Sequence, residues 1–153
     1  MKELDGLLTT LQTNIKHQHL TIPNISKASV GWHIEHSLLI FNLIIEALGK
    51  SNPDAYKRSF DIRRIVVMLS GKFPRGRVQA PKATRPTTDF NVETLQQHIS
   101  ISREKLKTLE GLSAGHYFTH PFLGDFRLKA AIKFIRIHTN HHLHIIKDIV
   151  THV

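Results

Sequence analysis

The chain has 153 residues, no cysteine, 12 histidines and a formal net charge of +9 at pH 7. This length suits a single domain, 1–153, with a hydrophobic core of its own. Without cysteine the chain forms no disulfide, thiolate metal site or iron–sulfur cluster, so any metal must be held by histidine and carboxylate. No apolar run approaches about 18 residues and the N-terminus has no secretory pattern, so we expect a soluble cytoplasmic protein without membrane contact.

Leucine and isoleucine spacing predicts the first two helices. Apolar residues at helical intervals predict a first helix over residues 3–19. Ser26 or Ser29 is suited to cap a second, longer helix, which ends near residue 48 because Gly49 follows.

The middle of the chain is predicted to hold short helical segments and a long loop. Asn52 followed by Pro53 predicts the cap and first turn of a short helix, and residues 61–70 continue helically until Gly71. From residue 73 to residue 90 proline and glycine are frequent and the helical period is lost. This predicts a long loop, of the kind that often has a functional role.

The last third of the chain predicts two more helices. Asn91 caps a helix over residues 92–110, and Asp125 is expected to cap a final helix that runs nearly to the end. Residues 115–124 are predicted to be irregular, because no strand-like alternation of useful length occurs in the chain. We therefore predict an all-α fold, an antiparallel four-helix bundle with an extra short helix and a long loop between helices three and four.

Much of the positive charge lies in the predicted loop at residues 72–85, which contains no acid and five basic residues: Lys72, Arg75, Arg77, Lys82 and Arg85. Such a run is most often solvated, but it also suits an anionic substrate or partner. Arg75 and Arg77 are the first candidates to bind a carboxylate or phosphate. The chain has no nucleic-acid-binding motif, so a nucleic-acid partner is not expected.

The final predicted helix carries four histidines between residues 138 and 144. Residues four apart lie on one face about one turn apart, and a helical wheel places His138 and His142 in the apolar seam. His141 falls on the shoulder of that seam. His144 falls on the charged face, where we expect it to be exposed.

The second predicted helix presents another inward histidine, His36, between Trp32 and Leu39 on one apolar face, with His33 on its flank. The opposite face is also apolar, which indicates either a central helix or a subunit contact. A homodimer through this helix is therefore a further expectation.

A single buried histidine is more often satisfied by a carbonyl or hydroxyl group than by a metal. Three inward imidazoles change this balance, because burying each one costs free energy unless its nitrogens find partners. One shared ion meets one nitrogen of every ring. The spacing therefore predicts a divalent metal site inside the helices.

His36 ends the segment Val-Gly-Trp-His-Ile-Glu-His36, and the last helix contains His138-Thr-Asn-His141-His142. By these motifs, and by helix order and length over nearly the whole chain, the sequence resembles the DinB-like superfamily, also called YfiT-like metal-dependent hydrolases. The segment His120-Pro-Phe-Leu-Gly-Asp125 is similar to one branch of the superfamily, for which the resemblance implies no substrate. The resemblance implies that His36, His138 and His142 bind one divalent ion, zinc or nickel above others, with open positions for water or substrate.

The activity implied by the resemblance is activation of water or of a substrate thiol, by a hydrolase or a thiol transferase with a small-molecule substrate. Neither Glu35 nor Glu46 points squarely at His36 on the helical wheel. The acid or base is therefore sought in His33 first and then in His141, both of which equally suit a role in orienting the ligands.

Tyr117 and His120 are further candidates to contact the substrate. Two other function classes stay open: a helical protein that binds metal without catalysis, and a basic module that binds an anionic partner. A structural zinc site is closed by four protein ligands, whereas a catalytic site keeps a position for solvent.

Overall fold

The computed structural model describes residues 1–73, 84–87 and 90–152. These residues form a mostly helical structure with five α-helices: α1 (Lys2–Thr13), α2 (Val30–Lys50), α3 (Ile62–Ser70), α4 (Val92–Thr108) and α5 (Leu128–Thr151). Short 3-10 turns lie at Ile15–His17, Pro53–Ala55 and Leu109–Gly111. Each helix predicted from the sequence is present, with ends that differ by a few residues. None of the helices in the described ranges is both long enough and apolar enough to cross a lipid bilayer.

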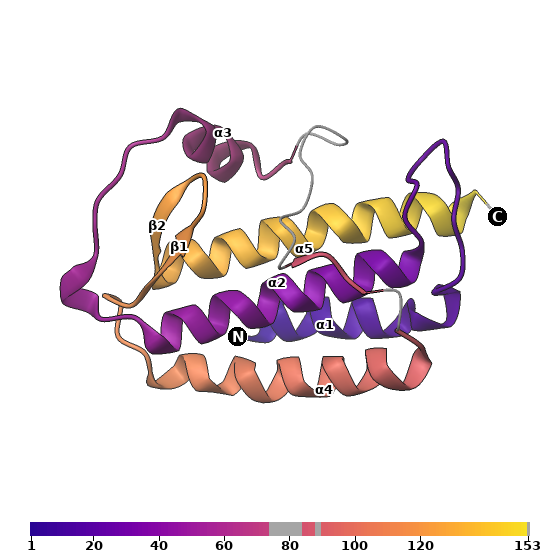
Figure 1. The fold of residues 1–153 in the computed structure, drawn as a ribbon, viewed down its shortest axis with the longest axis horizontal. Coiled ribbons are helices and arrows are strands. Elements are labelled where there is room, and N and C mark those ends of the chain that lie inside the picture. Colours follow the sequence, from indigo (N-terminus) through magenta and orange to yellow (C-terminus); the bar gives the residue numbers. More distant parts are fainter. Residues whose placement is uncertain (74–83, 88–89, 153) are drawn as a thin grey trace.

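The four long helices lie side by side, with α2 packed against both α4 and α5, and α1 packed against the same two helices. Figure 1 shows that α1 and α5 run in one direction and that α2 and α4 run in the other. Neighbours α2 and α4 are therefore parallel, which differs from the predicted antiparallel arrangement. The reason is the long connection between them, which contains α3 and returns the chain to the end at which α2 began.

Polar side chains fix the helix starts. Ser29 caps α2 by accepting a hydrogen bond from the Trp32 amide at 3.2 Å, which selects it over Ser26. Asn91 and Thr94 form a reciprocal capping box at the start of α4, so two orphan amide donors of the first turn are satisfied. The prediction of a cap at Asn91 is confirmed.

A small hairpin replaces the irregular connection that was predicted before the last helix. Strands β1 (Tyr117–His120) and β2 (Gly124–Arg127) pair antiparallel, with Phe118 opposite Phe126. These two rings stack with centroids 5.1 Å apart, and both contact Phe134 of α5. The hairpin is thereby attached to the first half of α5, and the prediction of no strand in this region was wrong.

Asp125 does not cap the last helix. It is buried within β2, where it accepts hydrogen bonds from the Lys57 amide at 2.9 Å and from the Thr119 hydroxyl at 2.7 Å. Arg127 occupies the position before α5 and makes no side-chain cap. The carboxylate instead ties the hairpin to the segment that follows α2.

Most of α2 is buried inside the chain, although Leu43 is exposed. Its far side, which includes Ile34, Leu38, Phe41 and Ile45, belongs to the core together with residues of α1, α4 and α5. A central position, one of the two alternatives open from the sequence, therefore explains the apolar far side of this helix but not the exposed Leu43. A homodimer through α2 stays a prediction without this support.

Candidate metal centre

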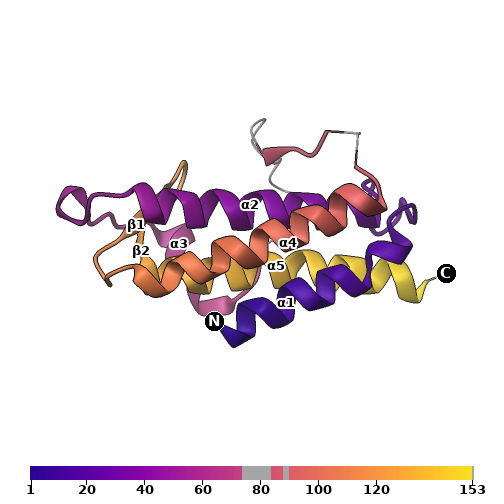
Figure 2. The same ribbon diagram turned by 90° about the horizontal axis from the view of Figure 1, so that it is seen from below.

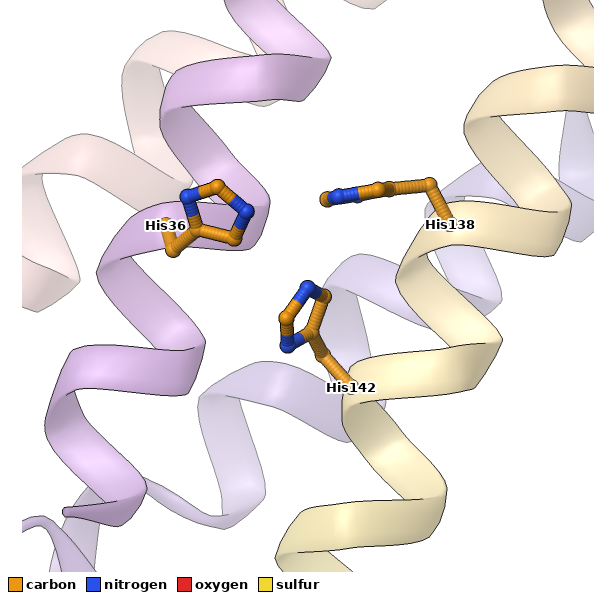
Figure 3. A group of neighbouring side chains, drawn as sticks. All are labelled: His36, His138 and His142. Carbon is orange, nitrogen blue, oxygen red and sulfur yellow. The ribbon is translucent and has the colours of Figure 1, made fainter. Parts of the chain in front are cut away.

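Three histidine rings meet between α2 and α5, His36 from α2 and His138 and His142 from α5 (Figure 3). One ring nitrogen from each residue lies within 4.8 Å of the others. The ring centroids are 5.1 Å apart for His36 and His138, 4.8 Å for His36 and His142, and 4.7 Å for His138 and His142. Two nitrogens bound to one zinc ion lie at most about 4.2 Å apart, since each bond is about 2.0–2.1 Å long. In tetrahedral geometry this separation is about 3.4 Å, so the three rings would draw closer together on binding an ion.

The helix pattern places these rings as the spacing predicted. His138 and His142 are one turn apart on the face of α5 that packs against α2, while His144 is exposed. His141 lies at the edge of the cluster, partly buried, with its ring 5.1 Å from that of His142. The wheel positions of all four histidines of α5 are confirmed.

His36 is held in one tautomer by the backbone. Its Nδ1 lies 2.7 Å from the carbonyl oxygen of Thr84, and a carbonyl only accepts, so Nδ1 must carry the proton. The Nε2 atom of His36 is then a free electron-pair donor, as a metal ligand requires. Trp32 stacks on the ring at 4.9 Å with an interplanar angle of 16° and further fixes its orientation.

His142 has a side-chain partner instead. Its Nδ1 lies 2.9 Å from Nδ1 of His33, and Nε2 of His33 lies 2.9 Å from the hydroxyl oxygen of Ser26. His33 is buried, with 4% of its surface exposed. His33, which was predicted on the flank of the His36 face, therefore contacts His142 of the cluster.

His138 carries a buried polar atom without a partner. Its Nδ1 is buried and has no hydrogen bond to any described residue, and its ring packs beside those of Phe73 and Phe134, with centroids at 5.9 and 6.3 Å. Such an atom in an apolar setting costs about 1–3 kcal/mol when it is left unsatisfied. A cluster of three imidazoles with an orphaned nitrogen, in a chain that offers no thiolate, fits a divalent ion bound by nitrogen.

Burial keeps the cluster in its neutral form. Burial lowers the pKa of His36 and lowers the pKa values of His138 and His142 well below their ordinary value. The neighbouring histidines add to the lowering at His138 and His142, because they disfavour a second positive charge. Metal ligation requires neutral imidazole. The cluster therefore has the protonation state of a ligand set at neutral pH.

Comparison with known protein families identifies the chain. The family model described as the DinB superfamily matches residues 2–146, a range that contains all three histidines of the cluster. The chain belongs to the DinB superfamily. The comparisons with curated proteins and with solved structures find no match. The resemblance inferred from the sequence is confirmed at the level of the superfamily.

The two carboxylates of α2 in this DinB superfamily chain point away from the cluster, as predicted. Glu35 pairs with His98 of α4 at 2.9 Å, beside a cavity of about 290 Å³ that contains no residue of the cluster in its lining. Glu46 is exposed and pairs with Lys105. Neither residue is placed to act as an acid or base on a ligand of the three histidines.

The other residues predicted to contact the substrate are His120 and Tyr117 of the hairpin, and Arg75 and Arg77. His120 is in β1, and its ring lies 5.3 Å from that of Phe134, one turn before His138. Tyr117 packs on Tyr56 at 5.6 Å, in the part of the hairpin next to the end of α2. Arg75 and Arg77 lie outside the described residues.

Three groups at the cluster were not found from the sequence: the Ser26 hydroxyl, the Thr84 carbonyl and the Phe73 ring. Ser26 was considered only as a helix cap. A backbone carbonyl has no residue-type signature, so no pattern could have indicated Thr84. Phe73 stands at the start of the predicted loop, and nothing in the local sequence places its ring against His138 and His141.

The buried histidines predict that the metal-free protein loses stability in acid. Burial lowers the pKa of His120 to about 4 and lowers those of the cluster histidines below their ordinary value of 6.5. The unfolded chain therefore takes up protons from about pH 6.5 downward, whereas the folded chain does so only at lower pH, and the stability is present above pH 6.5 and lost below it.

Urea unfolding of metal-free protein at about pH 7.5 and about pH 5.5 measures this effect, because the carboxylates remain largely ionised at both values. We expect a lower unfolding midpoint at the more acidic pH. Equal midpoints would show that these histidines are as accessible to protons in the folded chain as in the unfolded one.

Proposed function

We propose that this DinB superfamily protein is a metal-dependent enzyme in which His36, His138 and His142 hold one divalent ion. The observation that carries the proposal is the composition of the cluster. Within the described residues, three histidines are grouped closely enough to share an ion, and no fourth histidine or carboxylate joins them. Three protein ligands are typical of catalytic metal sites, which keep a position open, whereas structural zinc sites use four.

Zinc and nickel are the proposed ions. Imidazole nitrogen suits both, as it suits copper and iron, and the preference for zinc and nickel comes from the resemblance to the DinB-like superfamily. The ion would act as a Lewis acid that activates water or a substrate thiol. Three neutral imidazoles leave its charge uncompensated, which supports hydrolysis or thiol transfer, since both reactions present an anionic oxygen or sulfur to the site.

His33 and His141 are the proposed outer residues. Both ring nitrogens of His33 already lie at hydrogen-bond distance from His142 and Ser26, which supports a role in orienting His142 rather than in moving protons. His141 stands partly exposed at the rim, between His142 and Phe73. We therefore propose His141 as the acid or base.

The proposed substrate is a small molecule with an anionic group. The loop between α3 and α4 reaches the cluster at both ends, through Phe73 against His138 and through Thr84 against His36. Arg75 and Arg77 lie between these two residues in the sequence, and we propose that they bind the anionic group. His120 and Tyr117 of the hairpin complete the proposed substrate contacts.

Metal analysis and cobalt substitution test this function. Protein purified without a histidine tag is expected to contain close to one zinc or nickel ion per chain. After replacement by Co²⁺, addition of a small thiol should change the visible absorption spectrum, because the thiolate enters the open position. A protein that binds no divalent ion would overturn the metal site. A cobalt spectrum unchanged by thiols and small anions would indicate a closed site and favour metal binding without catalysis.

A further inference from the structure

A chain of polar atoms leads from the cluster to the segment before α2. It begins at Nδ1 of His142, passes through both ring nitrogens of His33, and ends at the hydroxyl oxygen of Ser26, with both links 2.9 Å long. Ser26 also accepts a hydrogen bond from the amide of Ala28 at 3.1 Å. A turn closed by the Ser26 amide on the carbonyl of Ile22, at 2.9 Å, holds the segment in place.

The link between the two Nδ1 atoms contains one proton, and its side determines what His142 can do. If His33 carries the proton, Nδ1 of His142 is the acceptor and its Nε2 carries a hydrogen, so His142 cannot bind an ion. If His142 carries it, its Nε2 is a free electron-pair donor. Nε2 is the only nitrogen of His142 left for the cluster, because Nδ1 is engaged with His33.

The link to Ser26 is compatible with both arrangements, because the hydroxyl can donate to Nε2 of His33 or accept from it, and binding of an ion through Nε2 of His142 requires the second. When His142 donates to Nδ1 of His33, His33 must carry its own proton on Nε2 and donate it to Ser26. The Ser26 oxygen has two lone pairs, which are sufficient for His33 and for the amide of Ala28. The three N–H donors of this arrangement, from His142, His33 and Ala28, then each meet an acceptor.

We infer that His33 and Ser26 are positioning residues which fix His142 in the tautomer and orientation that bind a divalent ion through Nε2. This inference rests on the proposed metal site and adds a supporting shell to it. His36 receives the same support from the Thr84 carbonyl, so two of the three ligands have a partner behind them. Partners of this kind contribute about 10- to 100-fold to metal affinity.

Nitrogen NMR of the histidine rings in zinc-loaded wild-type protein tests the inference without any substitution. We expect a protonated Nδ1 and a zinc-bound Nε2 for His142, together with a protonated Nε2 and an unprotonated Nδ1 for His33. The opposite tautomer of His33 would overturn the inference. Absence of zinc binding would overturn the metal site as well, so the two failures are distinguishable.

Zinc affinities from competition with a chromophoric chelator give a second readout. His33→Phe removes the acceptor and is expected to weaken binding by about 10- to 100-fold. His33→Asn keeps an acceptor oxygen near the position of Nδ1 and should retain most of the affinity. Ser26→Ala should weaken binding less, and should add little in the His33→Phe background, since both act on one chain of hydrogen bonds.

His98→Phe is the matched control, because His98 is also partly buried and paired through its ring, but with Glu35 on the other side of α2. Its zinc affinity should equal that of the wild type. Thermal unfolding of each metal-free variant checks that the fold is kept. Wild-type affinity in folded His33→Phe would overturn the inference.

Discussion

His138→Ala is expected to abolish stoichiometric metal binding. The variant keeps His36 and His142, but two imidazoles in place of three leave the ion with one bond fewer and a wider opening to solvent. The loss of affinity should exceed the roughly 10- to 100-fold that follows from removing an outer partner of a ligand. Elemental analysis after dialysis against a weak chelator measures the ion content of variant and wild type side by side.

His144→Ala provides the control for this measurement. His144 belongs to the same helix but is exposed and outside the cluster, so its removal should leave the ion content unchanged. This comparison also separates specific binding from general attraction of metal to a histidine-rich chain. Full occupancy in His138→Ala would remove His138 from the ligand set and leave its buried nitrogen without an explanation.

His138→Leu is expected to make the metal-free protein more stable than the metal-free wild type. The Nδ1 atom of His138 is buried without a hydrogen bond from any described residue, and two phenylalanine rings flank the imidazole. An apolar side chain of similar size removes the unsatisfied atom and keeps the contacts. The free energy of unfolding should rise by about 1–3 kcal/mol, the usual penalty of an unpaired buried polar group.

Excess zinc should reverse this order of stability. Zinc at about 1,000 times its dissociation constant stabilises the folded wild type by about 4.1 kcal/mol through mass action, whereas His138→Leu has lost the site and gains little. Urea unfolding with and without zinc measures both effects. The buried neighbour Ile135 serves as control, since Ile135→Val should lower stability by about 0.5–1.5 kcal/mol with and without the ion. A metal-free His138→Leu that is less stable than wild type would contradict the account of His138.

The helices could be predicted from the sequence because their signals are local. Side-chain caps at Asn52 and Asn91 and the apolar periods are properties of short segments, and the structure confirms them. The hairpin was not predicted because its strands are four residues long and are stabilised by packing against the ring of Phe134, a contact made only in the folded chain. Asp125 illustrates the same point, since its partners Lys57 and Thr119 are not apparent from its neighbours in the sequence.

One part of the candidate metal centre could likewise be predicted from the sequence, and another part could not. The inward faces of His36, His138 and His142 follow from helix geometry, so the sequence was sufficient to bring them together. Two of their outer partners, Ser26 and Thr84, come from segments before and after α2, and Thr84 is 48 residues from His36 in the sequence. Such contacts depend on how the loops fold back on the helices, and a periodic pattern contains no information about that.

The hydrogen bond that supports His36 is less sensitive to mutation than the one that supports His142, because its acceptor is a backbone carbonyl. Every residue type has a main-chain oxygen, so a point mutation at position 84 alters the side chain and leaves the acceptor for His36 in the backbone. The support of His142 consists of two side chains, and a single missense change that removes the polar group of either one interrupts it. Inherited variation should therefore affect the two ligands unequally, with positions 26 and 33 the more vulnerable.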